Sequence, residues 1–180
     1  MNKILKLRIN ILYINPEIWR EILVENDIAF EELHNIIQII FGWTNSHLYN
    51  FDLNGTIFSY PNEEFWNEDL DARNKITEYF YSKKQKCIYT YDYGDNWKHN
   101  IKIVDIIEKD NIKYPICIAG KRNGPPEDCG GIHGYANIID VLKNNDKDYD
   151  DLLEWVGDYN PEEFDINKVN KALQNLDEYL

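Results

Sequence analysis

The segment CIYTYDYGDNWKHNIKI, Cys87 to Ile103, constrains the fold most strongly, because two alternating runs flank a short polar turn. In each run the aromatic and apolar residues fall on one face, as in a strand with one side buried: Tyr89, Tyr91 and Tyr93, then Trp97, His99, Ile101 and Ile103. The two faces coincide only if the turn has an odd number of residues. We therefore predict an antiparallel hairpin with a three-residue turn over 94–96, in which Tyr93 lies opposite Trp97 and Tyr91 opposite His99.

Further strands are expected before this hairpin. Residues 4–11 alternate in the same way, and residues 18–24 resume the alternation. The pair Asn54-Gly55 stands between two more alternating runs and predicts a second tight hairpin. Residues 61–86 carry a weaker, charged pattern, with a helical turn expected around 73–80.

Helices are predicted early in the chain and again near its end. Apolar residues at steps of three and four predict a helix over 30–41 that ends at Gly42. After Gly131 the chain shows three short apolar stripes at helical spacing, and Pro161 followed by two glutamates resembles a helix start. The predicted class is α+β: a mainly antiparallel or mixed sheet from the N-terminal two thirds, packed with one early helix and a C-terminal group of helices.

Composition limits the classes of partner. The chain has 180 residues, 43% of them hydrophobic, and a formal net charge of -13. One folded domain over residues 1–180 is expected. Nucleic acid is disfavoured as a partner because its affinity comes largely from Lys and Arg. The odd count of three cysteines fits reduced thiols, and no apolar run is long enough for a membrane span, so we expect a cytoplasmic protein without a membrane partner.

Four blocks of the sequence carry a resemblance to a known family. They are PEIWREILVENDIAFEELHNIIQIIFGWTNSHLYNF, YTYDYGDNWKHNI, YPICIAGKRNGPPEDCGGIHGY and EWVGDYNPEEFDINKVN. In order and spacing the chain resembles the plasmid pRiA4b ORF-3-like family over essentially its whole length. The resemblance implies a compact α+β domain of bacteria and archaea without an established activity.

Two positions depart from the family pattern that the resemblance implies. Gly124 stands where many relatives have the first cysteine of CPPEDC, which argues against a two-cysteine metal or redox role for that loop. Glu21 stands where relatives tend to have an arginine, which removes one potential anion contact.

Some members of that family are labelled as resolvase-like passengers of mobile elements. A serine resolvase needs a nucleophilic serine among arginines and a basic DNA-binding region. The serines here are Ser46, Ser59 and Ser82, and none lies beside clustered arginines. The resolvase label therefore carries little weight for this chain.

Two stretches supply the residues of a candidate pocket. The hairpin and the loop NGPPEDCGGIHGY together offer Tyr91, Asp92, Asp95, Trp97, His99, Glu127, Asp128, Cys129 and His133. No cofactor is expected, but carboxylates with imidazole suit a divalent metal, and the weak metal candidates are His47, Asp95, His99, Glu127 and Asp128. No HExxH motif strengthens that signal.

Each of these residues also has a structural interpretation. Asp95 can serve the turn, His34, His99 and His133 can be satisfied core histidines, and Cys129 a small buried hydrophobe. For Glu127 and Asp128 the structural interpretation is capping of a helix that begins near Ile132.

Three functions stay open. The favoured one is a non-enzymatic binding or interaction module for a protein or small ligand, with an aromatic and acidic groove lined by Tyr91, Trp97, His99 and the loop 123–135. The alternative is a metal-dependent hydrolase or nuclease-like enzyme in which Asp92, Asp95, His99, Glu127 and Asp128 supply ligands and a general base. The third, a mobile-element-associated nucleic-acid-binding protein, would need a basic patch such as Lys83, Lys84 and Lys86.

Overall fold

The computed structural model describes residues 3–60, 69–144 and 149–176. Its strands are β1 Lys3–Ile11, β2 Trp19–Glu25, β3 Tyr49–Leu53, β4 Thr56–Ser59, β5 Leu70–Asp71, β6 Lys86–Tyr91, β7 Trp97–Glu108 and β8 Ile116–Lys121. Its α-helices are α1 Phe30–Phe41, α2 Gly131–Asn144, α3 Tyr149–Val156 and α4 Ile166–Gln174. A short 3-10 helix, Ile76–Glu78, falls within the segment where a helical turn was expected.

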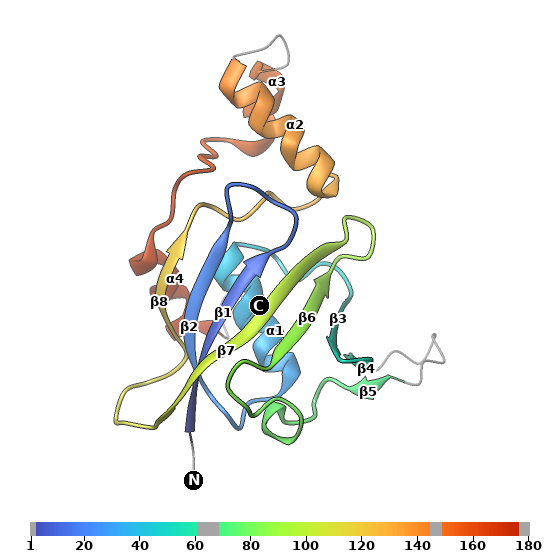
Figure 1. Cartoon of the computed structure of the whole chain (residues 1–180). Coiled ribbons are helices and arrows are strands. Elements are labelled where there is room, and N and C mark those ends of the chain that lie inside the picture. The colour runs from blue at the N-terminus through green and yellow to red at the C-terminus, as the bar shows by residue number, and fades with distance from the viewer. Residues whose placement is uncertain (1–2, 61–68, 145–148, 177–180) are drawn as a thin grey trace.

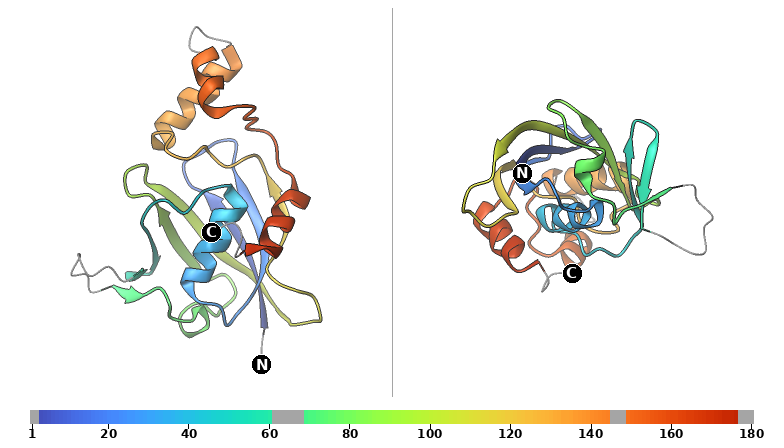
Figure 2. Two further views of the ribbon diagram at one scale, coloured as in Figure 1. Left: turned by 180° about the vertical axis from the view of Figure 1, so that it is seen from behind. Right: turned by 90° about the horizontal axis from the view of Figure 1, so that it is seen from below.

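The strands form one mixed sheet in the order β5-β4-β3-β6-β7-β1-β2-β8. Only the short pair β4 and β5 is parallel; the other neighbouring pairs are antiparallel. The helices α1 and α4 lie on one face of the sheet, which curves around α1, while α2 and α3 extend beyond one end of it (Figures 1 and 2). The predicted α+β class, with an early helix and C-terminal helices, is confirmed.

The main core lies between the sheet and α1. Alternate residues of β1 and β2 are buried, as a strand with one face against a helix requires. In α1, Glu32 accepts a hydrogen bond from the backbone N–H of Ala29 (2.7 Å) at the start. The helix ends at Gly42, whose φ of 81° is left-handed. The predicted hairpin at Asn54-Gly55 is also present, with Leu53 paired to Thr56.

The central hairpin has the predicted faces but a different register. Tyr91 pairs with Trp97 and Tyr89 with His99, so the turn has five residues, 92–96, and the three-residue prediction is wrong. Asp92 and Asn96 adopt left-handed conformations (φ 54° and 56°), and the Asn96 N–H bonds to the Asp92 carbonyl oxygen at 2.6 Å. The turn is thus two residues longer than predicted, and Tyr93, which was expected on the buried face, lies within it and is 49% exposed. Because five and three are both odd, the buried face is unchanged.

The C-terminal helices differ from the prediction at one boundary. No helix begins at Pro161; α4 starts at Ile166, because the Asp165 side chain accepts hydrogen bonds from the N–H groups of Asn167 and Lys168 (2.9 and 3.1 Å). The following residues, Ala172 and Leu173, are buried against α1 and β8. The helix start predicted at Pro161 is therefore too early, and the N-cap is Asp165.

Candidate metal centre

Three loops meet at the end of the sheet from which α2 extends. They are the loop after α1, the turn between β6 and β7, and the loop between β8 and α2 (Figure 1). Each brings one or more chemically active side chains.

The loop after α1 carries His47 and is fixed by a buried polar network. Gln38 of α1 accepts a hydrogen bond from the Asn45 N–H (3.0 Å) and donates another to the Tyr89 hydroxyl (3.0 Å). His34 joins the same groups, with Nδ1 2.7 Å from the Tyr89 hydroxyl and Nε2 2.6 Å from Asn45 Oδ1. Burial lowers the pKa of His34 to about 4, so the ring is neutral and donates from Nε2. The predicted structural role of His34 thus agrees with its position.

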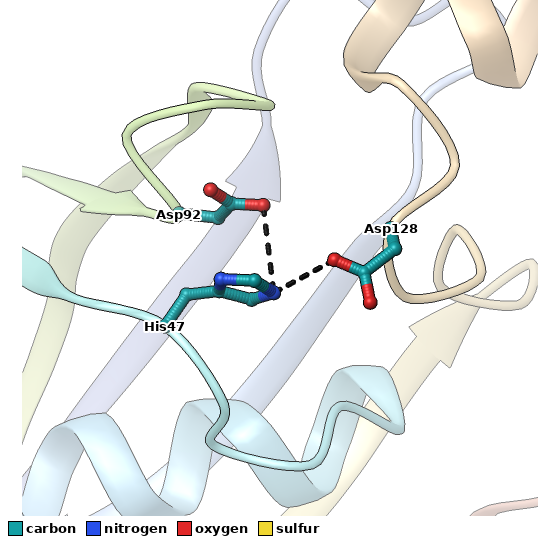
Figure 3. Close-up of side chains that lie close together, drawn as sticks. All are labelled: His47, Asp92 and Asp128. Atoms are coloured by element: carbon teal, nitrogen blue, oxygen red, sulfur yellow. Dashed lines mark hydrogen bonds and ion pairs between the residues drawn. The ribbon is translucent and has the colours of Figure 1, made fainter.

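The turn between β6 and β7 carries Asp92. Its Oδ1 accepts a hydrogen bond from the Gly94 N–H (2.8 Å), which leaves Oδ2 directed toward His47 (Figure 3). The Asp92 backbone N–H in turn bonds to the Leu48 carbonyl oxygen (2.9 Å). The first loop and the turn are therefore joined through main-chain as well as side-chain contacts.

The loop between β8 and α2 crosses the C-terminal end of α1. A Cβ at Gly124 would lie 2.0 Å from the Phe41 carbonyl oxygen, so the close approach requires glycine. The Pro125 carbonyl oxygen accepts a hydrogen bond from the indole N–H of Trp43 (3.0 Å). These contacts direct Glu127 and Asp128, which follow the two prolines, toward the loop that carries His47.

The corner cluster, as we call His47, Asp92, Glu127 and Asp128, forms where these loops meet. Nε2 of His47 lies 2.8 Å from Asp128 Oδ1, 3.8 Å from Asp92 Oδ2 and 3.9 Å from Glu127 Oε1. One ligand atom from each of His47, Asp92 and Asp128 falls within 4.8 Å of the others (Figure 3). Three side chains from three loops thus share one small volume, open to solvent on the side of Asp128.

Glu127 is held by neighbours on the inner side of the corner cluster. Its Oε2 accepts hydrogen bonds from the N–H and the hydroxyl of Thr44 (2.9 and 3.1 Å), and its Oε1 accepts one from the Tyr91 hydroxyl (3.0 Å). Burial, and next to it the negative charge of Glu127, raise the pKa of Tyr91, so the phenol stays a donor. Glu127 is therefore a fixed carboxylate beside the imidazole.

The capping interpretation of Glu127 and Asp128 is wrong. Both side chains turn away from α2, toward Thr44 and His47. The acid near the start of α2 is Asp95, whose Oδ2 accepts a hydrogen bond from the Gly130 N–H at 3.1 Å. Asp95 thereby ties the hairpin turn to the loop, and no hydrogen bond or ion pair of the described residues joins it to His47.

The other predicted pocket residues lie elsewhere. Trp97 and His99 are fully enclosed in the core, so neither can line an open groove. Burial lowers the pKa of His99 to about 3, its Nδ1 lies 3.0 Å from the Trp97 carbonyl oxygen, and its Nε2 has no partner among the described residues. Cys129 is a buried thiol whose pKa burial raises to about 12. His133 is exposed on α2, contrary to a core position.

Sequence reasoning missed Thr44 and gave Asp92 less weight than Asp95 as a metal ligand. No short-range signal marks Thr44, because its role depends on a carboxylate 83 residues away. For Asp92 a signal existed: Asp is one of the residue types that tolerate the left-handed conformation with which a hairpin turn can begin.

A mixed eight-stranded sheet with α1 and α4 on one face and a histidine and carboxylate cluster at one end defines an α+β protein with a candidate metal centre. This chain belongs to the plasmid pRiA4b ORF-3-like protein family, whose model matches residues 3–168.

Two similar proteins agree with that assignment. The chain is 30% identical over 178 residues to the uncharacterized protein y4hQ of Sinorhizobium fredii (strain NBRC 101917 / NGR234), covering 96% of this chain and 92% of y4hQ. It is similar to the crystal structure of the protein of unknown function MM3350 from Methanosarcina mazei Go1, with 34% identity and a TM-score of 0.84 over 93% of this chain and 97% of that one. Neither relative carries an assigned function.

Over residues 3–60, 69–144 and 149–176, no helix has the length and apolar character needed to cross a bilayer.

Proposed function

We propose that this protein is a binding module that holds one divalent metal ion at the corner cluster. The observation that supports the proposal is the convergence of His47, Asp92 and Asp128, whose ligand atoms lie within 4.8 Å of one another. Ligands around one zinc ion stand about 2.0 to 2.2 Å from it, so a small closure of these side chains would bring all three into its coordination shell. Of the metal ligands predicted from the sequence, the proposed site includes His47 and Asp128 and excludes Asp95 and His99.

The donor set favours a particular kind of ion. One imidazole with two or three carboxylates combines ligands that suit zinc with ligands that suit manganese and magnesium. The carboxylates supply the charge that balances the ion, and the fixed loop orients the imidazole. We therefore infer Zn²⁺ or Mn²⁺ rather than an alkaline-earth ion.

The hydrogen bonds of Glu127 favour a binding function over a hydrolytic one. In metalloprotease sites a carboxylate that is free to accept a proton acts as the general base on the metal-bound water. Both oxygens of Glu127 already accept hydrogen bonds from Thr44 and Tyr91, which suits a carboxylate that positions neighbours. The hydrolase interpretation remains the alternative, because three protein ligands would leave open positions on the ion.

Domain extent and location belong to the same proposal. We infer one domain over residues 1–180, supported by the family match and by a core shared between the sheet, α1 and α4. A cytoplasmic location is supported by the three cysteines, which are free and buried. Nucleic acid binding is disfavoured because Lys83, the first lysine of the proposed basic patch, is paired with Asp105 at 2.5 Å.

The metal proposal is tested on full-length protein purified without a histidine tag. We expect chelator-treated protein to bind one Zn²⁺ or Mn²⁺ per chain in calorimetric titration. Asp128→Asn should weaken that binding at least about tenfold, because even groups that only support a metal ligand contribute about that much. Asp128 is largely exposed, so the variant should fold normally.

Asp158→Asn is the matched control, since Asp158 is exposed and lies outside the corner cluster. It should bind the ion as the unmodified protein does. Absence of saturable binding of both ions, or equal affinity of Asp128→Asn and the unmodified protein, would contradict the proposal.

A further inference from the structure

A second site candidate lies between the C-terminal end of α1 and α4, on the helix-covered side of the sheet. A cavity of about 440 Å³ opens there, lined by Arg20 of β2, Phe41 of α1, Phe164 before α4, and Lys168 and Val169 of α4. Its volume falls within the range that small organic ligands occupy. None of these residues belongs to the corner cluster.

Arg20 is a buried cation without an acidic partner. The residue is 2% exposed, and the hydrogen bonds that it makes with the described residues all go to backbone carbonyl oxygens and none to a carboxylate. Burial lowers its pKa to about 10, which still leaves the guanidinium charged at neutral pH. A buried charge without a counter-charge is unfavourable unless something compensates for it.

Only some of the N–H donors of this guanidinium have acceptors among the described residues. Nε donates to the Ile40 carbonyl oxygen (2.8 Å), and Nη1 donates to the carbonyl oxygens of Trp19 and Lys121 (2.8 and 3.0 Å). Nη2, which carries two further N–H donors, has no acceptor among the residues that the structure describes. The unused donors belong to a side chain that lines the cavity.

Aromatic rings hold the guanidinium in place. Its carbon lies 4.3 Å from the centre of the Phe164 ring and 5.0 Å from that of Phe41. A Cβ at Gly120 would come within 2.8 Å of both Phe164 and Arg20, so the backbone of β8 leaves room for this stack. The cation is therefore positioned before any ligand arrives, beside an apolar surface.

We propose that this cavity binds a small organic monocarboxylate, with its carboxylate on Nη2 of Arg20 and its apolar body against Phe164 and Val169. The charged side chains around the cavity favour a ligand with one negative charge over a ligand with two. Besides Arg20, the lining contains one positive side chain, Lys168, and two negative ones, Glu163 and Asp165, so its net charge is zero. With a monoanion bound, the cavity and its ligand together carry a net charge of minus one. A dianion such as phosphate would be repelled more strongly by Glu163 and Asp165.

The probe is 4-phenylbutyrate, and its uncharged amide is the matched ligand control. In calorimetric titration of the full-length protein, we expect the acid to bind about 10- to 100-fold more tightly than the amide, the range for a hydrogen bond to a charged group. Equal affinity of acid and amide, or no saturable binding of the acid, would overturn the proposal.

Two variants keep the test independent of folding defects. Lys168→Glu reverses an exposed charge at the cavity and should weaken binding of the acid without changing binding of the amide. Lys171→Glu makes the same charge change on the same helix, at an exposed position outside the lining, and should have a smaller effect. If the two variants weaken acid binding equally, the carboxylate does not lie in the cavity.

Val169→Phe supplies a separate check on the location. The larger side chain fills part of the cavity and leaves Arg20 unchanged, so both the acid and the amide should lose binding. Circular dichroism establishes that the variant is folded. Unchanged affinity in the folded variant would place the ligand elsewhere and contradict the proposal.

Discussion

Gly124 shows how one residue sets the position of the candidate metal centre. It lies at the point where the loop after β8 passes the last carbonyl group of α1, with no room for a side chain. The next residues contact Trp43 and then direct Glu127 and Asp128 to His47. The glycine at this position permits a backbone contact that any side chain would prevent.

Gly124→Ala should destabilise the protein. The added Cβ would lie 2.0 Å from the Phe41 carbonyl oxygen, and a backbone atom at a helix end moves only with its helix. We expect a loss of about 1 to 3 kcal/mol in the free energy of unfolding, the usual effect of overpacking, measured by urea denaturation. Gly94→Ala is the control, because its Cβ would meet only the Asp92 side chain at 3.2 Å. An equal loss in both variants would contradict this interpretation of Gly124.

Among the secondary-structure elements, α4 connects the end of the chain to the sheet. Its apolar side packs on α1 and β8, and its first turn borders the cavity at Arg20. The helix has only nine residues, and the first four N–H groups and last four C=O groups of any helix lack partners within it, so capping groups matter for its stability. The N-cap Asp165 satisfies two of the free N–H groups.

Asp165→Ala should therefore destabilise the fold by about 1 kcal/mol, as removal of an N-cap does, and Asp165→Asn should retain most of that stability. Chemical denaturation of the three proteins measures the difference. Glu163→Ala removes the same charge two residues earlier, where the side chain has no cap contact, and is expected to leave stability nearly unchanged. If Glu163→Ala lost as much stability as Asp165→Ala, the effect would come from the removed negative charge and not from the lost N-cap.

At the scale of the whole molecule, the sheet and α1 enclose polar groups as well as apolar ones. His34 lies in the hydrogen-bonded network under the loop of His47, and His99 lies among Phe41, Trp43 and Tyr89. Burial lowers the pKa of both histidines, to about 4 and about 3. Both rings are neutral in the folded protein at neutral pH.

The free energy of unfolding should fall as the solution is acidified below about pH 6.5. In that range His34 and His99 become protonated in the unfolded chain but stay neutral in the folded protein. The loss continues until the folded-state pKa is reached, near 4 for His34 and 3 for His99. Each histidine should contribute about 2 kcal/mol between about pH 7 and pH 5, at about 1.4 kcal/mol per unit. Urea denaturation at the two pH values measures the sum.

Two glutamine variants separate the histidines from other titrating groups. His34→Gln should remove one histidine's share of the fall in stability between the two pH values, whatever its effect on stability at neutral pH. His133→Gln makes the same substitution at an exposed ring on α2 and is the matched control. An unchanged pH dependence in His34→Gln would mean that His34 is not held neutral.

The sequence by itself determined which residues face the core and where the clearest elements begin and end. Alternation in β1, β2 and the central hairpin, helical spacing in α1, and Gly42 and Asn54-Gly55 at the chain reversals are local signals, set by backbone geometry over a few residues. They predicted the α+β class and the buried face of Tyr89 and Tyr91. They also predicted His47 and Asp128 as metal candidates, although not that the two would meet.

Only the tertiary structure decided which of the chemically capable residues lie together. His47 and Asp128 are 81 residues apart, and their 2.8 Å contact depends on the path of a loop across the end of α1. Likewise, Arg20 has the pattern of an ordinary strand residue, and its burial without an acid follows from the packing of α1 and α4 around it. Such contacts join distant segments whose approach is set by the packing of the whole core, which no local pattern encodes.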